Sequence, residues 1–316
     1  MNPGRRMAQL ARLACTAGTA AILLTACGGG TSQIEPFKPA QYVVLGDESS
    51  LIDAQGRRYT VNPHNANTGA LDCTLQPIWT QAVANRFGFV FAECNPGGAT
   101  EFRAQMRASA GARVGDIEAQ IDAQLADGGF AEKSLVTVMA GGNDILALYA
   151  DYPRRSEEEL VAQARELGVR VGMLVNHLIE LGPRVVVSTI PDLGLSPYAL
   201  AEQAAHTDTD RAALISRLVA AFNGRIRTTI VNDGRYVGLV LADEIVQAIA
   251  RAPSPYGVKN ATSPVCTVAL PDCTDRTLVE SGNSSSWLWA DDRRLAFGGQ
   301  LYLGNLAVAR VANNPF

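Results

Sequence analysis

Short apolar runs alternate with longer stretches of helical spacing from residue 42 to the end of the chain. The runs that predict strands are Tyr42–Leu45, Phe89–Ala92, Leu135–Met139, Arg184–Ile190 and Tyr236–Leu241. The stretches that predict helices are Pro77–Phe87, Val114–Leu125, Ser156–Leu181, Thr209–Ile230, Asp243–Ala250 and Gly298–Ala312. Strands separated by helices form βαβ units, which build a parallel sheet with helices on both faces. We therefore expect a three-layer α/β/α sandwich.

Two polar turns follow strands of this expected sheet. Gly46-Asp47-Glu48 comes directly after the first strand, and Gly142-Asn143-Asp144 follows the strand Leu135–Met139. In open parallel sheets, ligands bind beyond the carboxyl ends of the strands. The two turns are therefore expected to share one cleft, although they are far apart in the sequence.

The N-terminus predicts an exported protein. A basic start with Arg5, Arg6 and Arg12 precedes an apolar run that is too short to span a bilayer. The run ends in Leu24-Thr25-Ala26-Cys27, which resembles the bacterial lipobox, whose cysteine is lipidated after cleavage. We expect a signal peptide over 1–26, a lipid anchor on Cys27, a flexible tether over 27–40 and one folded domain over 41–316. An ordinary signal peptide with a chance cysteine is the alternative. The residue after Cys27 is Gly28 rather than aspartate, and by the sorting rule of bacterial lipoproteins this favours the outer membrane.

The charge balance excludes nucleic acid as an expected partner. The chain has 27 basic and 31 acidic residues, and cleavage would remove three arginines and no acid. There are only three lysines, and basic residues form no cluster. No cofactor is expected. The expected partners are a small-molecule ligand and, through the lipid anchor, the membrane. The chain is expected to be a monomer.

Four cysteines remain after the expected processing, because Cys15 lies in the signal peptide and Cys27 would carry lipid. An even number in an exported protein indicates two disulfides, for which four cysteines allow three connectivities. We favour Cys73–Cys94 and Cys266–Cys273, since each closes a local loop. Zinc is not expected, because no pair has C-x-x-C spacing and no histidine lies near.

Four separated stretches resemble the motif blocks of the SGNH or GDSL hydrolases, which are esterases and lipases on a flavodoxin-like, five-stranded parallel sheet. They are Gly46-Asp47-Glu48, Gly111 within ASAGARVGDIEAQI, Gly141-Gly142-Asn143-Asp144, and Asp291 within WLWADDRRLAFGGQLYL. The segment PSPYGVKNATSPVC also resembles the stretch that precedes the last block in lipase-type members. The resemblance implies that Gly111 and Asn143 donate hydrogen bonds to an oxyanion and that Asp291 belongs to a catalytic triad.

Two positions depart from this pattern. Glu48 stands where the family has its nucleophilic serine, and Arg294 stands where it has its histidine. A serine hydroxyl needs a base to remove its proton, and arginine stays protonated at any working pH. We therefore expect weak or no ester hydrolysis. The opposite charges predict an ion pair between Glu48 and Arg294, with Asp291 as a second partner of the guanidinium.

Ser49 and Ser50 leave an alternative open. Either is a candidate for a nucleophile in a shifted register, although helix capping or turn bonding is the ordinary role of serine after a strand. Among the histidines, only His64 lies in a loop that could reach the cleft, whereas His177 within a helix and His206 at the entry to one are expected to be ordinary surface or packed residues. Three functions follow: a non-hydrolysing protein that binds a small acyl, glycan or lipid ester ligand, an active esterase, and an envelope scaffold.

Overall fold

The computed structural model describes residues 37–313. The expected signal peptide over 1–26, the expected lipidation site Cys27 and most of the expected tether over 27–40 lie outside the described residues. Within 37–313, no helix is both long enough and apolar enough to cross a membrane.

The central sheet has five strands that all run parallel. They are β1 (Gln41–Gly46), β2 (Ala104–Met106), β3 (Ser134–Met139), β4 (Arg184–Ser188) and β5 (Val237–Val240). Their order across the sheet is β2-β1-β3-β4-β5, which is the flavodoxin-like order. The predicted fold class is therefore confirmed. Nearly every side chain of β1, β3 and β4 is buried, because helices cover both faces.

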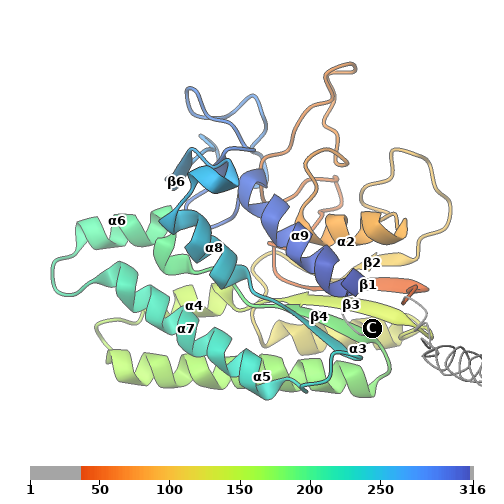
Figure 1. Ribbon diagram of the computed structural model, residues 1–316, viewed down its shortest axis with the longest axis horizontal. Helices are drawn as coiled ribbons and strands as arrows, with labels where there is room; N and C mark the ends of the chain where they lie inside the picture. Colours follow the sequence, from red (N-terminus) through yellow and green to blue (C-terminus); the bar gives the residue numbers. More distant parts are fainter. Residues whose placement is uncertain (1–36, 314–316) are drawn as a thin grey trace, which may run out of the picture. The chain divides into compact units, whose positions relative to one another are not determined.

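The helices form the two outer layers (Figure 1). One face of the sheet carries α2 (Trp79–Phe87) and α9 (Phe297–Asn313), with α8 (Ala242–Arg251) beside α9. The other face carries α3 (Asp116–Ala126), α4 (Gly142–Tyr149), α5 (Glu157–Glu180) and α7 (Arg211–Thr229). Shorter elements are α6 (Pro197–Ala205), η1 (Leu193–Leu195) and η2 (Ser254–Tyr256).

The predicted helices have ends within two residues of those observed. The spacing of Ser156 and Glu159 predicts a capping box at the start of α5, and both of its hydrogen bonds are present. At the other end of α5, Gly182-Pro183 stops the helix before β4. Local signals at helix ends were therefore sufficient to place these elements.

The predicted strand Phe89–Ala92 is wrong. Phe89 and Phe91 are buried because their rings pack against the ring of Tyr42, at centroid distances of 5.9 and 5.7 Å. Apart from one isolated bridge to Cys94, this segment pairs with no strand. The true edge strand is β2, which pairs with Tyr42–Val44. Its three residues, Ala-Gln-Met, are too few and too mixed to show a strand pattern.

A two-stranded parallel ribbon lies outside the main sheet and was not predicted. It pairs β6 (Asn260–Pro264) with β7 (Trp287–Trp289). Trp289 is fully buried and donates its indole N–H to the carbonyl of Ala261, at 3.0 Å. This tryptophan belongs to the hydrophobic core. The segment that contains Asp291 and Arg294 follows directly after β7.

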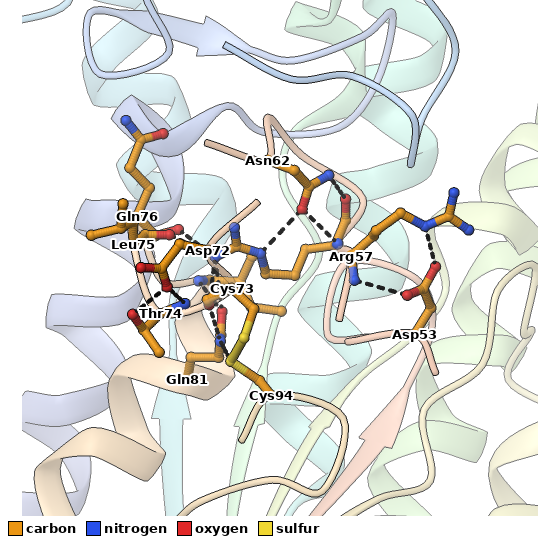
Figure 2. Close-up of a disulfide and its surroundings, with 12 residues drawn as sticks. Asp53, Arg57, Asn62, Asp72, Cys73, Thr74, Leu75, Gln76, Gln81 and Cys94 are labelled. Carbon is orange, nitrogen blue, oxygen red and sulfur yellow. Dashed lines mark hydrogen bonds and ion pairs between the residues drawn. A yellow bond between two sulfur atoms is a disulfide. The ribbon is translucent and has the colours of Figure 1, made fainter. Parts of the chain in front are cut away.

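Both predicted disulfides are present, and each lies in a loop region at the carboxyl ends of the strands. Figure 2 shows Cys73–Cys94 with its surroundings. Beside this disulfide lies Arg58, whose side chain is entirely buried. The guanidinium donates to the carbonyls of Cys73, Leu75 and Gln76, and to the side chains of Asn62 and Gln81. One buried arginine thus holds the loop that follows β1.

Candidate active site

Two glycines bring the polar turns after β1 and β3 together. Gly46 has a φ of +136°, and a Cβ there would lie 2.1 Å from the carbonyl oxygen of Met139. Gly141 has a φ of +122°, and its Cβ would lie 2.2 Å from the ring of Phe222. Only glycine tolerates such backbone approach. The ends of these neighbouring strands therefore place Glu48 within reach of Asn143.

The predicted ion pair between Glu48 and Arg294 is present. Oε1 of Glu48 accepts from Nη2 of Arg294 at 2.6 Å and from Nε at 3.1 Å. Nη1 of Arg294 donates to Oδ2 of Asp291 at 2.6 Å, and the backbone N–H of Arg294 donates to Oδ1 at the same distance. The guanidinium thus bridges two carboxylates, as expected from its planar fork of donors.

The second carboxylate oxygen of Glu48 lies between the two expected oxyanion-hole donors. Oε2 accepts from the backbone N–H of Gly111 at 2.8 Å and from Nδ2 of Asn143 at 3.0 Å. Gly111 and Asn143 therefore converge as the resemblance implied, but on an oxygen of the protein itself. The sequence led us to expect donors left free for a ligand carbonyl or carboxylate. In the structure the two donors are not left free, because Glu48 accepts a hydrogen bond from each of them.

Charge and burial set the protonation of this site. Burial raises the pKa of Glu48, but the charge of Arg294 and the hydrogen bonds from Asn143 and Gly111 outweigh it and hold the pKa below its ordinary value. Burial lowers the pKa of Arg294, while the charges of Asp291 and Glu48 raise it, and the net direction is upward. Both partners therefore stay charged at neutral pH.

Asp47 behaves differently from its neighbour. Burial, together with the negative charge of Glu48, raises the pKa of Asp47 to about 7. Its Oδ1 accepts from the backbone N–H of Ser49 at 2.9 Å. Two adjacent carboxylates thus have pKa values shifted in opposite directions, because Glu48 bonds the guanidinium of Arg294 directly, whereas burial and the charge of Glu48 dominate at Asp47.

A cleft lies next to the pair, beyond the carboxyl ends of the strands. It is lined by polar residues that include Asp47, Asn143 and Gln300, and by apolar residues that include Leu146 and Leu193. The position of Gln300 on the cleft wall could not be predicted from the sequence, because Gln300 is one polar residue within a long amphipathic helix. The position of Tyr59, whose ring faces the guanidinium of Arg294 at 5.5 Å, could not be predicted either.

The structure separates the two serine candidates. Ser49 lines the cleft, whereas Ser50 is fully buried and its hydroxyl has no hydrogen-bond partner among the described residues. No helix begins at either serine, so the helix-capping interpretation is wrong. The segment forms a turn instead, in which the backbone N–H of Ser50 bonds the carbonyl of Asp47.

No histidine of the chain lines the cleft. His64 pairs with Asp275, His177 lies 3.7 Å from Glu180, and His206 lies 3.4 Å from Glu202. The possibility that His64 reaches the cleft is therefore not supported. Ser49 therefore has no histidine base within the cleft.

Comparisons with known proteins give one family. Residues 42–279, more than half of the chain, match the model of the GDSL-like lipase/acylhydrolase family. A search of curated protein sequences finds no significant match.

Among solved structures, the chain is similar to an acetylxylan esterase from Geobacillus stearothermophilus, with 14% identity over 88% of this chain and 97% of that chain and a TM-score of 0.41. It is also similar to a lipase from a goat rumen metagenome, with 13% identity over 65% and 81% of the two chains and a TM-score of 0.41. A third is an alpha/beta hydrolase enzyme from the metagenome of Lake Arreo, with 13% identity over 87% and 96% and a TM-score of 0.43.

Proposed function

The chain belongs to the GDSL-like lipase/acylhydrolase family, and from this premise we propose that it is a non-hydrolysing member that binds a small acyl, glycan or lipid ester ligand. One observation carries the proposal. The carboxylate of Glu48 accepts hydrogen bonds from Gly111, Asn143 and Arg294, and it lies where a substrate oxyanion would need those donors. A carboxylate bound by four donor atoms is also a poor nucleophile.

The first experiment measures hydrolysis of a short p-nitrophenyl ester. The wild-type rate should equal the background rate, and Ser49→Ala and Ser50→Ala should not change it. A fluorophosphonate probe, read by mass spectrometry, should label no serine of the wild type. Robust wild-type hydrolysis that disappears with Ser49→Ala would instead establish the alternative, an active esterase. That alternative is favoured only by the position of Ser49 on the cleft wall.

The second experiment restores the family residues. Glu48→Ser combined with Arg294→His should hydrolyse the ester at least about tenfold faster than the wild type, since general-base catalysis contributes roughly 10²–10⁴-fold. Glu48→Ser with Arg294→Gln is the matched control, because it has the serine without a base. Adding Asn143→Ala to the active double variant should then lower its rate by about 10²–10³-fold, because one oxyanion donor is lost.

We also propose that the protein is a lipid-anchored component of the bacterial envelope, held in the outer membrane. Leu24-Thr25-Ala26-Cys27 supports this proposal. The change Cys27→Ser should leave the protein either soluble in the periplasm or unprocessed. A cleaved Cys27→Ser variant that still fractionates with membranes would contradict the lipid anchor.

A further inference from the structure

The cleft beside Glu48 and Arg294 is open to solvent, and its wall exposes more apolar than polar surface. Its apolar side chains come from the end of β3, from α4, from the loop after β4 and from α9. Met139, Leu146, Ile190, Leu193 and Leu303 are examples. Such a wall fits a hydrocarbon body.

Two polar side chains on this wall are almost fully buried. Asp47 is 4% exposed, and its Oδ1 accepts from the backbone N–H of Ser49. Gln300 is 3% exposed, and its Oε1 accepts from the backbone N–H of Trp79. Because both side chains line the cleft and carry a second polar atom, they offer polar contact points for a molecule in the cleft.

The charges around the cleft disfavour an anion. The donors that would bind a ligand carboxylate, Gly111, Asn143 and Arg294, already bind Glu48. An incoming carboxylate would therefore meet the carboxylate of Glu48 as a like charge. Arg293 also lines the cleft, but its Nε lies 3.2 Å from the carboxylate of Asp292, which balances its charge.

We propose that this cleft binds a neutral molecule with an apolar body and a hydroxyl or carbonyl group, and that it excludes the corresponding free carboxylate. Oδ2 of Asp47 would accept from a ligand hydroxyl, and Nε2 of Gln300 would donate to a ligand oxygen. The inference rests on the closed, non-hydrolysing site proposed above. The proposal limits the ligands of the cleft to intact esters and alcohols, and it excludes as ligands the carboxylic acids that ester hydrolysis would release.

The test compares 1-octanol with octanoate, which have chains of equal length and differ in charge at about pH 8. Binding to the purified protein is measured by isothermal titration calorimetry. Octanol should bind saturably, and octanoate should bind at least about tenfold more weakly. In Glu48→Ala, the donors of Gly111, Asn143 and Arg294 become free, so the affinity for octanoate should rise at least about tenfold relative to the affinity for octanol.

Two substitutions locate the binding site. Leu146→Trp places a large ring in the cleft and should abolish octanol binding, and Leu193→Phe, from a different wall segment, should weaken it. Leu125→Trp, on an exposed position of α3 that is 41% exposed, is the matched control and should bind as the wild type does. Circular dichroism checks that each variant is folded.

Equal affinity for octanol and octanoate in the wild type would overturn the proposal. Failure of both to bind, or octanol binding that survives both cleft substitutions, would do the same. Neither compound is an ester, so the titration is independent of hydrolysis. Measurable wild-type ester hydrolysis with the octanol preference intact would therefore defeat the proposed function and leave the ligand class standing.

Discussion

Arg58 and Arg294 are two arginines that differ in burial and in the presence of carboxylates among their hydrogen-bond partners. Arg58 is fully buried and donates only to carbonyl and amide oxygens. Arg294 keeps 17% of its side chain exposed and bonds the carboxylates of Glu48 and Asp291. Burial lowers the pKa of Arg58 to about 10, partly opposed by the charge of Asp72, whereas its two carboxylates raise the pKa of Arg294.

Arg58 is a cation of the protein interior, whereas Arg294 is a cation on the wall of the cleft. Around Arg58 the oxygens belong to one loop and its neighbours, so the guanidinium acts as a fixed internal hydrogen-bond donor. Around Arg294 the partners are side chains from the turn after β1 and from the segment after β7, and they face the cleft. We therefore expect substitutions of Arg58 to act on stability, and substitutions of Arg294 to act on the cleft.

Arg58→Leu should have the largest effect on folding. The carbonyl oxygens of Leu75 and Gln76 have no other hydrogen-bond partner within the described residues, and each orphaned carbonyl costs about 1–3 kcal/mol. We expect the free energy of unfolding, measured with urea, to fall by about 2–6 kcal/mol. Arg58→Lys should lose less, because an ammonium still donates up to three bonds. Equal stability of Arg58→Leu and the wild type would show that the loop does not depend on this arginine.

The two disulfides should have the next largest effects, and they sharpen the same contrast. Cys73–Cys94, beside Arg58, joins residues 21 apart, whereas Cys266–Cys273 joins residues 7 apart. Loop-closure entropy predicts a loss of about 3 kcal/mol when the first pair is changed to alanine, and about 2 kcal/mol for the second. Urea unfolding of the two double variants measures this. A larger loss for Cys266–Cys273 would show that loop entropy does not dominate.

Glu48 and Arg294 should be coupled in a double-mutant cycle. Arg294→Gln leaves Glu48 and Asp291 without their cation, and Glu48→Gln leaves the guanidinium with only Asp291. The double variant should be less destabilised than Arg294→Gln alone, with a coupling energy of about 0.5–3 kcal/mol. Strictly additive losses of unfolding free energy would mean that the pair contributes no mutual stabilisation.

The sequence predicted the layers of the fold and the convergence of Glu48, Gly111, Asn143 and Arg294. Apolar periodicity is strong in long helices and buried strands, and Gly46 and Gly141 mark positions where only a hydrogen fits. The sequence did not predict β2, because a three-residue edge strand carries little apolar pattern. It also did not predict that Oε2 of Glu48 would take the oxyanion donors, since side-chain direction in a tight turn depends on neighbours that are distant in sequence.

The burial of Arg58 was not predicted from the sequence, for a related reason. A single arginine in a polar loop predicts a solvated side chain, because charged residues are seldom fully buried. Its burial depends on several acceptors, of which Cys73 and Gln81 come from segments that no local pattern connects to it. Gln300 is similar, since its role on the cleft wall depends on how α9 packs beside α2.

The last expected effect concerns Asp47 and appears as a pH dependence of stability. Its pKa is raised to about 7 from an ordinary value of 3.8, so the folded state holds a proton that the unfolded state releases. The stabilisation is complete below pH 3.8 and is lost as the pH rises through about 7. Glu48, whose pKa is lowered, acts in the opposite direction but only below its ordinary value of 4.5. Between about pH 5 and 7, wild-type stability should therefore fall by up to about 1.4 kcal/mol per pH unit through Asp47.

Asp47→Asn isolates this contribution, because asparagine keeps an oxygen for the Ser49 N–H and does not titrate. The difference in unfolding free energy between wild type and Asp47→Asn should change steadily with pH over this window, to the disadvantage of the wild type at higher pH. Glu132→Gln, at an exposed position, is the matched control and should follow the wild-type curve. A constant difference between wild type and Asp47→Asn would mean that Asp47 is ionised throughout. The arginine in the cleft would then stabilise three carboxylates rather than two, and the contrast with Arg58 would be larger than described above.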